Sequence, residues 1–158
     1  MFKDMPKERL YEFARHAVPC VGFNTRRATR LITQHYDQAL APAGVRSTQY
    51  SLLSLLSLMG EAPMQEVALV LAMDRTTLTR NLNPLLKKGW VKVVTSSDRR
   101  ARPLTITPKG QSVLNKALPY WQAAQDRIVT AIGAEQWNVM MQGLHQISLI
   151  VEENEETA

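Results

Sequence analysis

The chain has 158 residues, 45% of them hydrophobic and 21% charged, with a formal net charge of +5 at pH 7. This composition is ordinary for a folded, soluble protein that is long enough to bury a real core. No apolar run reaches the roughly 18 residues of a membrane span, and the N-terminus lacks the apolar region of a secretion signal. The single cysteine, Cys20, excludes an intramolecular disulfide framework, a zinc ribbon and a CxxC redox pair. We therefore expect a cytoplasmic protein.

The charge is unevenly distributed along the chain. Residues 1–110 carry 17 Lys or Arg and 8 Asp or Glu, whereas residues 111–158 carry 2 and 6. Between residues 75 and 109, nine basic residues accompany one acidic residue, Asp98, for a net charge of +8. Such an excess favours a polyanionic partner, most often nucleic acid. Taken alone, a solvated basic surface explains it equally well.

Hydrophobic periodicity predicts a mainly helical chain with one short β-hairpin. In chain order, the expected helices cover about residues 5–17, 21–41, 47–59, 62–72, 75–88, 108–131 and 134–154. Pro19 breaks the chain between the first two helices, and a turn at 41–44 ends the second. Ser47 or Thr48 is the expected N-cap of the third helix and Gly60 its stop, and Pro63 lies in the first turn of the fourth. Asp74 and Gly89 mark the start and end of the fifth helix, and Thr107-Pro108 and Gly133 those of the sixth. The final helix is expected to end before a frayed acidic tail.

The segment "MDRTTLTRNLNPLLKKGW" (73–90) predicts an amphipathic helix with an unusual polar face. An advance of 100° per residue places four leucines on one stripe: Leu78, Leu82, Leu85 and Leu86. The other side carries hydrogen-bond donors and cations, and no glutamate: Thr76, Arg80, Asn83 and Lys87, flanked by Thr79. Such side chains donate to base edges and phosphates, whereas a merely solvated helix more often carries Glu–Lys pairs.

The residues before this helix have helix-turn-helix spacing. Ala68, Ala72 and Leu78 stand at i, i+4 and i+10, which supplies a small contact residue, a turn and an apolar anchor. Alanine replaces the usual turn glycine at position 72. Pro84 either bends the second helix or ends it early, leaving residues 85–88 as a separate turn.

A β-rich pair of segments, 90–97 and 103–108, surrounds the charged tip "DRRAR". A hairpin that follows a helix-turn-helix predicts a winged helix, whose tip contacts phosphates or an adjacent minor groove. The predicted wing residues are Asp98, Arg99, Arg100 and Arg102, with the carboxylate of Asp98 orienting an arginine.

These blocks resemble the MarR family of bacterial winged-helix transcription regulators. The resemblance covers about residues 20 to 115, through "NTRRATRLITQHYDQALAPAGV", "STQYSLLSLL", "MDRTTLTRNLNPLLKKGWV" and "SSDRRARPLTITPKG". Within the last block, Asp98-x-Arg100 followed by Leu104-x-Ile106-Thr107 is similar to the family's wing signature. The expected organisation is one structural unit with N-terminal helices (1–45), a winged helix-turn-helix (46–108), and C-terminal dimerisation helices with an acidic tail (109–158).

The resemblance implies a two-fold dimer in which N- and C-terminal helices intertwine and each winged helix binds half of a pseudo-palindromic operator. It implies that Thr76, Thr77 and Arg80 enter the major groove, and that Arg100 enters the minor groove with Asp98 as its partner. Arg75 and Thr79 accompany them, although the projection turns Arg75 partly toward the core. It also implies a repressor released by a small anionic aromatic or phenolic effector, bound between the dimer helices and the winged helix.

Several alternatives remain beside this hypothesis. One branch of the family senses hydroperoxides through a cysteine, but Cys20 lies two residues from that register, which favours a buried structural cysteine. The three histidines, His16, His35 and His145, lack metal-site spacing, and we expect no metal and no cofactor. The same winged helix could instead serve protein–protein contact. A small enzyme lacks support, because there is no phosphate-binding glycine loop, nucleophile elbow or HExxH motif.

Overall fold

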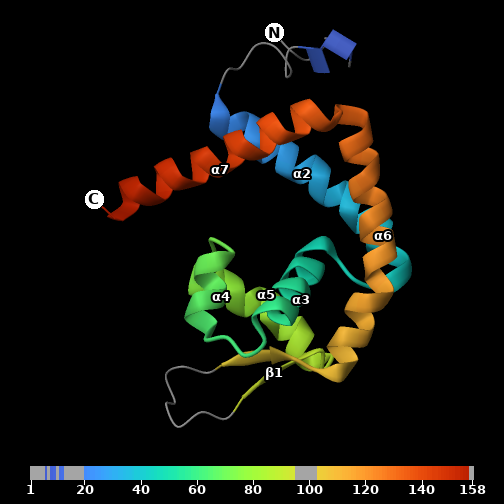
Figure 1. Cartoon of the computed structure of the whole chain (residues 1–158), viewed down its shortest axis with the longest axis vertical. Helices are drawn as coiled ribbons and strands as arrows, with labels where there is room; N and C mark the ends of the chain where they lie inside the picture. The colour runs from blue at the N-terminus through green and yellow to red at the C-terminus, as the bar shows by residue number, and fades with distance from the viewer. Residues whose placement is uncertain (1–5, 7, 10, 13–19, 95–102, 157–158) are drawn as a thin grey trace.

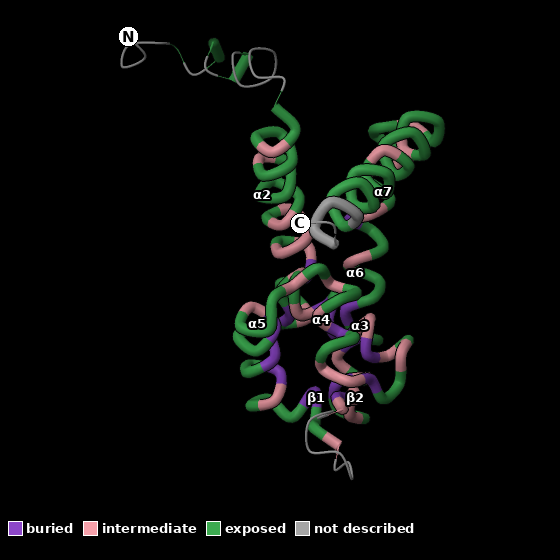
Figure 2. The backbone as a smooth tube through the Cα atoms, turned by 90° about the vertical axis from the view of Figure 1, so that its left-hand side faces the viewer, coloured by how far each residue is buried: buried purple, intermediate pink, exposed green. Residues whose placement is uncertain are grey.

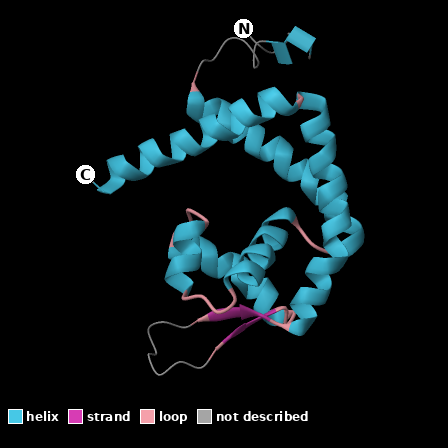
Figure 3. Cartoon of the chain, viewed as in Figure 1, coloured by secondary structure: helices cyan, strands magenta, loops and turns pink. Residues whose placement is uncertain are grey.

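The computed structural model describes residues 6, 8–9, 11–12, 20–94 and 103–156, without the side chains of 153–156. Its elements, in chain order, are α2 (Val21–Leu40), η1 (Ala41–Ala43), α3 (Ser47–Met59), α4 (Met64–Val70), α5 (Arg75–Lys87), β1 (Val91–Val93), β2 (Leu104–Ile106), α6 (Pro108–Ile132) and α7 (Ala134–Glu156). Figure 3 shows this mainly helical chain with its small hairpin, as predicted. The helix expected over 5–17 falls largely outside the described residues.

The helices form two groups that α6 connects. The chain enters through α2, folds α3, α4, α5 and the hairpin into a compact group, and then returns along α6 (Figure 1). α6 packs against both α2 and α3, and α7 follows it at the far end. The winged helix is thereby held at one end of α6, while α2 and α7 lie at the other.

The hairpin is short and is tied to the loop before α4. β1 and β2 are antiparallel, with Val91 opposite Ile106 and Val93 opposite Leu104. Leu104 also exchanges two backbone hydrogen bonds with Ala62, at N···O distances of 2.8 and 3.0 Å. This third connection fixes the base of the wing relative to the helix-turn-helix.

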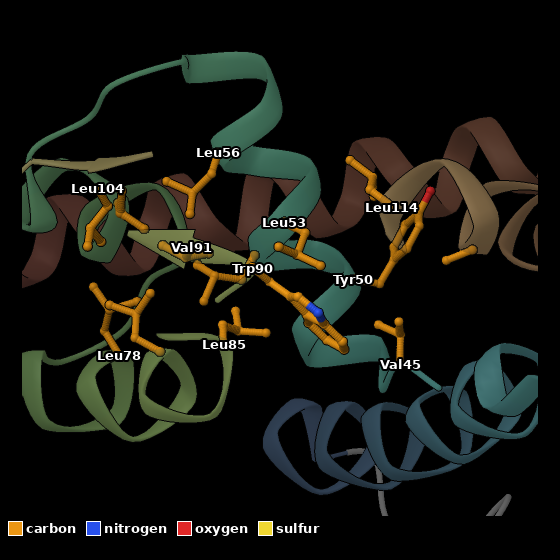
Figure 4. Close-up of a cluster of buried hydrophobic side chains, with 14 of the residues drawn as sticks. Val45, Tyr50, Leu53, Leu56, Leu78, Leu85, Trp90, Val91, Leu104 and Leu114 are labelled. Carbon is orange, nitrogen blue, oxygen red and sulfur yellow. The ribbon is translucent and has the colours of Figure 1, made fainter. Parts of the chain in front are cut away.

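The core lies between α3, α5, the hairpin and the start of α6. The leucines of α5 provide one wall, since Leu78, Leu82 and Leu85 are all buried. Side chains from the other elements meet them, among them Leu53, Leu56, Trp90, Val91, Leu104 and Leu114 (Figure 4). At the start of α6, a Cβ on Gly110 would lie 2.1 Å from the carbonyl oxygen of Trp90, so glycine permits this close approach.

Two predicted boundaries differ from the structure. The N-cap of α3 is Arg46, not Ser47 or Thr48. The reason is that Ser47 does not cap its own helix. Its N–H and its hydroxyl both donate to Oδ1 of Asp37 on α2. Likewise, Pro63 is the N-cap of α4 and does not lie in the first helical turn.

Two helices continue further than one interpretation of the sequence allowed. α5 runs through Pro84 to Lys87, so the alternative in which Pro84 ends the helix is wrong. Pro84 lies on the exposed side, and its missing N–H removes only one hydrogen bond from an otherwise amphipathic helix. α7 extends to Glu156, so the acidic stretch that was expected to be a frayed tail is helical to that point. The other predicted caps, at Asp74 and Thr107, are confirmed.

Candidate nucleic-acid interface

α5 begins at a well-formed N-cap. Asp74 accepts two hydrogen bonds from Thr77, from the backbone N–H at 2.8 Å and from the hydroxyl at 2.6 Å. The hydroxyl and N–H of Thr77 hold the pKa of the Asp74 carboxyl below its usual value, because both stabilise the charged form. The cap fixes the direction in which the first turn of α5 leaves the helix-turn-helix.

The turn between α4 and α5 has the geometry that its sequence spacing predicts. Ala72 adopts a left-handed conformation with φ of +47°, the only positive φ among the described residues other than glycine. Met73 donates from its N–H to the Ala68 carbonyl at 2.9 Å, and this hydrogen bond closes the turn. Leu78 is fully buried and anchors α5 beneath it. The segment is therefore a helix-turn-helix.

The face of α5 opposite the leucines is exposed to solvent and slightly hollowed. The hollow measures about 420 Å³ and is lined by Arg75, Thr76, Thr79, Arg80 and Asn83. Arg75 is exposed on this face, so the projection that turned it partly toward the core was wrong. A helical projection fixes only the direction in which Cβ leaves the helix axis, and a long arginine side chain has several rotamers that turn away from that direction. We call these five residues the α5 face.

Two of the predicted DNA-binding residues, Thr77 and Thr79, use their hydroxyls in hydrogen bonds within the protein. Thr77 is half-buried and donates to Asp74, so it lies beside the α5 face without lining the hollow. Thr79 lines the hollow, but its hydroxyl donates to the carbonyl of Arg75 at 2.7 Å. Both therefore present their methyl groups more readily than a free hydroxyl proton, and a methyl suits contact with thymine.

The surface around α5 is basic. Between residues 75 and 94 the chain carries five cations and no acidic residue: Arg75, Arg80, Lys87, Lys88 and Lys92. Lys88 holds its ammonium 4.1 Å from the ring centroid of Trp90, which positions it at the end of α5. A positive, donor-rich helix face of this kind is suited to a phosphate backbone and base edges.

The four predicted wing residues, Asp98, Arg99, Arg100 and Arg102, lie outside the described residues. The base of the hairpin is described on both sides of them, where the N–H of Val94 donates to the carbonyl of Pro103 at 2.8 Å. Their roles therefore stay predictions.

A second hollow, which sequence reasoning did not assign, lies between α2, α3 and α6. It measures about 320 Å³ and is lined by Ile32, Thr33, Tyr36, Ser47, Thr48, Tyr50, Ser51, Trp121 and Gln125. We call it the aromatic hollow. The rings of Tyr50 and Trp121 stack with centroids 5.6 Å apart and planes 17° apart. Tyr36 donates its hydroxyl to Oε1 of Gln125. No signal along the sequence brings these residues together, because they come from three distant helices.

Burial alters the tyrosines of this hollow. It raises the pKa of Tyr36, and it raises the pKa of Tyr50 against the opposing hydrogen bond with Ser54. Both tyrosines therefore stay protonated at neutral pH. Nearby, His35 places Nε2 3.2 Å from the carbonyl oxygen of Ala124.

Cys20 is exposed at the N-cap of α2, so the expectation of a buried structural cysteine is wrong. Cys20 precedes the helix as an N-cap residue with extended backbone, so it does not lie on a packed helix face, and its carbonyl accepts from the side chain of Asn24. Within the described part of the chain, no three His, Cys, Asp or Glu side chains gather as a possible metal site. None of the described helices is long and apolar enough to cross a membrane.

A helix-turn-helix with a basic outer helix face and a hairpin directly after it defines a winged-helix, DNA-binding transcriptional regulator. The family model described as "MarR family" matches residues 45–101. The M. tuberculosis transcriptional regulator MosR, crystallised in complex with DNA, is 35% identical with a TM-score of 0.78, over 85% of this chain and 97% of that one. The chain belongs to the MarR family.

Other relatives agree with this assignment. The HTH-type transcriptional regulator MhqR of Bacillus subtilis (strain 168) is 25% identical over 124 residues, 78% of this chain and 86% of MhqR. The multiple antibiotic resistance protein MarR of Salmonella typhimurium is 32% identical over 75 residues, 47% of this chain and 52% of that protein. The MosR and MhqR matches extend well beyond the winged helix, into the helices that surround it.

Proposed function

We propose that the protein is a homodimeric, sequence-specific repressor that binds a pseudo-palindromic operator and is released by a small molecule. The observation that carries the proposal is the α5 face, in which five exposed donor and cationic side chains line one hollow opposite the buried leucines. In this proposal α5 lies in the major groove, with Arg80 bidentate to a guanine and Thr76, Thr79 and Asn83 against neighbouring bases.

The exposed apolar surface supports the homodimer. Figure 2 shows that α2 and α7 are largely exposed, whereas burial concentrates in the winged helix. Large apolar side chains with between about one third and two thirds of their surface exposed lie along both helices: Leu31, Ile32, Val139, Met140, Met141, Leu144, Ile147, Ile150 and Val151. Apolar surface of this extent is typical of an interface, and a two-fold pair of copies covers it symmetrically.

The aromatic hollow supports control by a small molecule. It lies where α2 and α6 meet α3, the helix that packs behind the helix-turn-helix. A ligand bound there contacts both groups of helices, and it shifts the equilibrium toward the arrangement that it binds better. Release from DNA follows if that arrangement places the two copies of α5 at the wrong separation for the half-sites.

The experiment is a gel shift on operator DNA selected from genomic fragments by the purified protein. Arg80→Ala is expected to weaken operator binding by about 1–3 kcal/mol and to relax the preference at one base position. The matched control is Arg127→Ala, which removes an exposed arginine of α6 far along the chain from α5. Equal losses on operator and random DNA would reduce Arg80 to a phosphate contact. Failure to select any fragment at two salt concentrations would favour the protein–protein alternative.

A further inference from the structure

The chemistry of the aromatic hollow restricts what it can bind. We propose that the aromatic hollow binds an uncharged aromatic molecule with hydrogen-bonding groups, such as an aromatic amide, and discriminates against aromatic carboxylates. The inference rests on the proposed function, since it specifies the effector of the same regulator. It narrows the anionic aromatic or phenolic effector that the family resemblance implies to an uncharged molecule.

The walls of the aromatic hollow favour a flat ring. Tyr50 of α3 and Trp121 of α6 stack on each other, and Tyr36 of α2 adds a third aromatic side chain. Aromatic rings of this kind bind another ring through offset or edge contacts. The volume of about 320 Å³ suits a molecule with a single ring and one or two substituents.

The charges around the hollow disfavour an anion. Among the described residues, none of the nine that line the hollow is lysine, arginine or histidine. The N-terminus of α3, which borders the hollow through Ser47 and Thr48, is the place where an anion would gain most. That place is already used, because the Asp37 carboxylate accepts the N–H and the hydroxyl of Ser47 at 2.6 and 2.7 Å. A ligand carboxylate would lose its water, find no cation among the described lining residues, and lie beside Ser47, whose two donors Asp37 already occupies.

The polar groups of the hollow suit a neutral ligand that both donates and accepts. The amide nitrogen of Gln125 and the hydroxyls of Thr33 and Thr48 have no hydrogen-bond partner within the described part of the chain. Because Tyr36 donates to Gln125, its phenol oxygen keeps its acceptor capacity. A carboxamide matches such a set, because its oxygen accepts from the site while its nitrogen donates.

The test is a calorimetric titration of the full chain at pH 7 with two probes of nearly equal shape, 4-hydroxybenzamide and 4-hydroxybenzoate. The amide is expected to bind at least tenfold more tightly than the carboxylate. Trp121→Leu is expected to weaken amide binding at least fivefold, which places the probe in the aromatic hollow. Tighter or equal binding of the carboxylate, or no binding of the amide, would overturn the proposal.

A charge-addition pair makes the test independent of any loss of folding. Ser51→Lys places a cation on an exposed lining position whose hydroxyl donates to the Ser47 carbonyl of its own helix and is therefore not offered to the amide. It is expected to raise affinity for 4-hydroxybenzoate at least fivefold while the affinity for the amide changes less than threefold. The control is Gln34→Lys, the same charge on an exposed position of α2 outside the lining, for which no change is expected. An equal effect of both variants contradicts the charge argument.

A wrong prediction about the ligand of the aromatic hollow is distinguishable from a wrong proposed function. The titrations need no DNA, whereas operator binding is measured on the protein without probe. A protein that selects an operator but prefers the carboxylate retains its proposed function and loses only this inference.

Discussion

Oδ1 of Asp37, on α2, accepts hydrogen bonds from both the backbone N–H and the hydroxyl of Ser47, the first residue of α3. One helix thus caps another, and the cap joins the α2 side of the molecule to the winged helix. We expect Asp37→Ala to lower the free energy of unfolding by about 1–2 kcal/mol, since it leaves a half-buried donor of α3 without its partner. Urea denaturation measures this change.

The matched control for Asp37 is its neighbour Gln38, which is exposed on the same helix. Gln38→Ala is expected to change the unfolding free energy by less than about 0.5 kcal/mol. Ser47→Ala keeps the N–H donor, so its loss of unfolding free energy should lie between those of Asp37→Ala and Gln38→Ala. Equal stabilities for Asp37→Ala and Gln38→Ala would contradict a capping role for the carboxylate.

Ala72 in the helix-turn-helix occupies a backbone conformation that glycine adopts without cost. Its φ of +47° disfavours any residue with a Cβ, by about 1–2 kcal/mol. Glycine relieves that strain but gains freedom in the unfolded chain, so Ala72→Gly is expected to stabilise the protein by a net of about 0.5 kcal/mol. Thermal unfolding of the two proteins checks this.

The comparison for Ala72 lies four residues earlier. Ala68 is inside α4 with helical geometry, so Ala68→Gly is expected to destabilise by about 1 kcal/mol. If glycine raises the free energy of unfolding at position 72 and lowers it at position 68, the left-handed turn is the cause. The same sign at both positions would mean that lost packing, and not backbone strain, dominates at Ala72.

We expect Asp74 to make the stability of the folded protein depend on pH. Its pKa is lowered in the folded protein by the hydrogen bonds from Thr77, so the charged form stabilises the folded state. That stabilisation is fully present above the ordinary value of 3.8 and is lost as the pH falls through the lower folded value. Asp74→Asn should therefore lower the urea midpoint at pH 7, and its difference from the original protein should shrink in acid. A difference that stays constant down to pH 2.5 would contradict this.

Much of the winged helix was predictable because its signals are local. The leucine spacing of α5, the cap at Asp74, the stop at Gly89 and the Thr107-Pro108 pair are each set by residues a few positions apart. The hydrogen bonds at the start of α3 do not follow from local sequence. Their acceptor, the Asp37 carboxylate, lies on the previous helix, where no capping pattern in the sequence points to it.

The two candidate sites also differ in how far local sequence predicts them. Most of the α5 face follows from one helical projection. The projection differs from the structure at Arg75, which it turns partly toward the core, and at Lys87, which does not line the hollow. The aromatic hollow is assembled from Tyr36, Tyr50 and Trp121, which no periodicity connects. Only the packing of α2, α3 and α6 brings these rings to one place.

The wing prediction is tested on DNA. If Arg100 lies in the minor groove beside the half-site, its binding energy depends on groove width, which is narrow and strongly negative in A·T-rich sequence. We expect Arg100→Ala to weaken binding by about 1–2 kcal/mol on an operator with A·T flanks and by clearly less on one with G·C flanks. Gel shifts on the two operators, with Lys116→Ala as an exposed control on α6, measure the difference. Equal losses on both flanks would make Arg100 a phosphate contact, because phosphates attract a cation without regard to the bases between them.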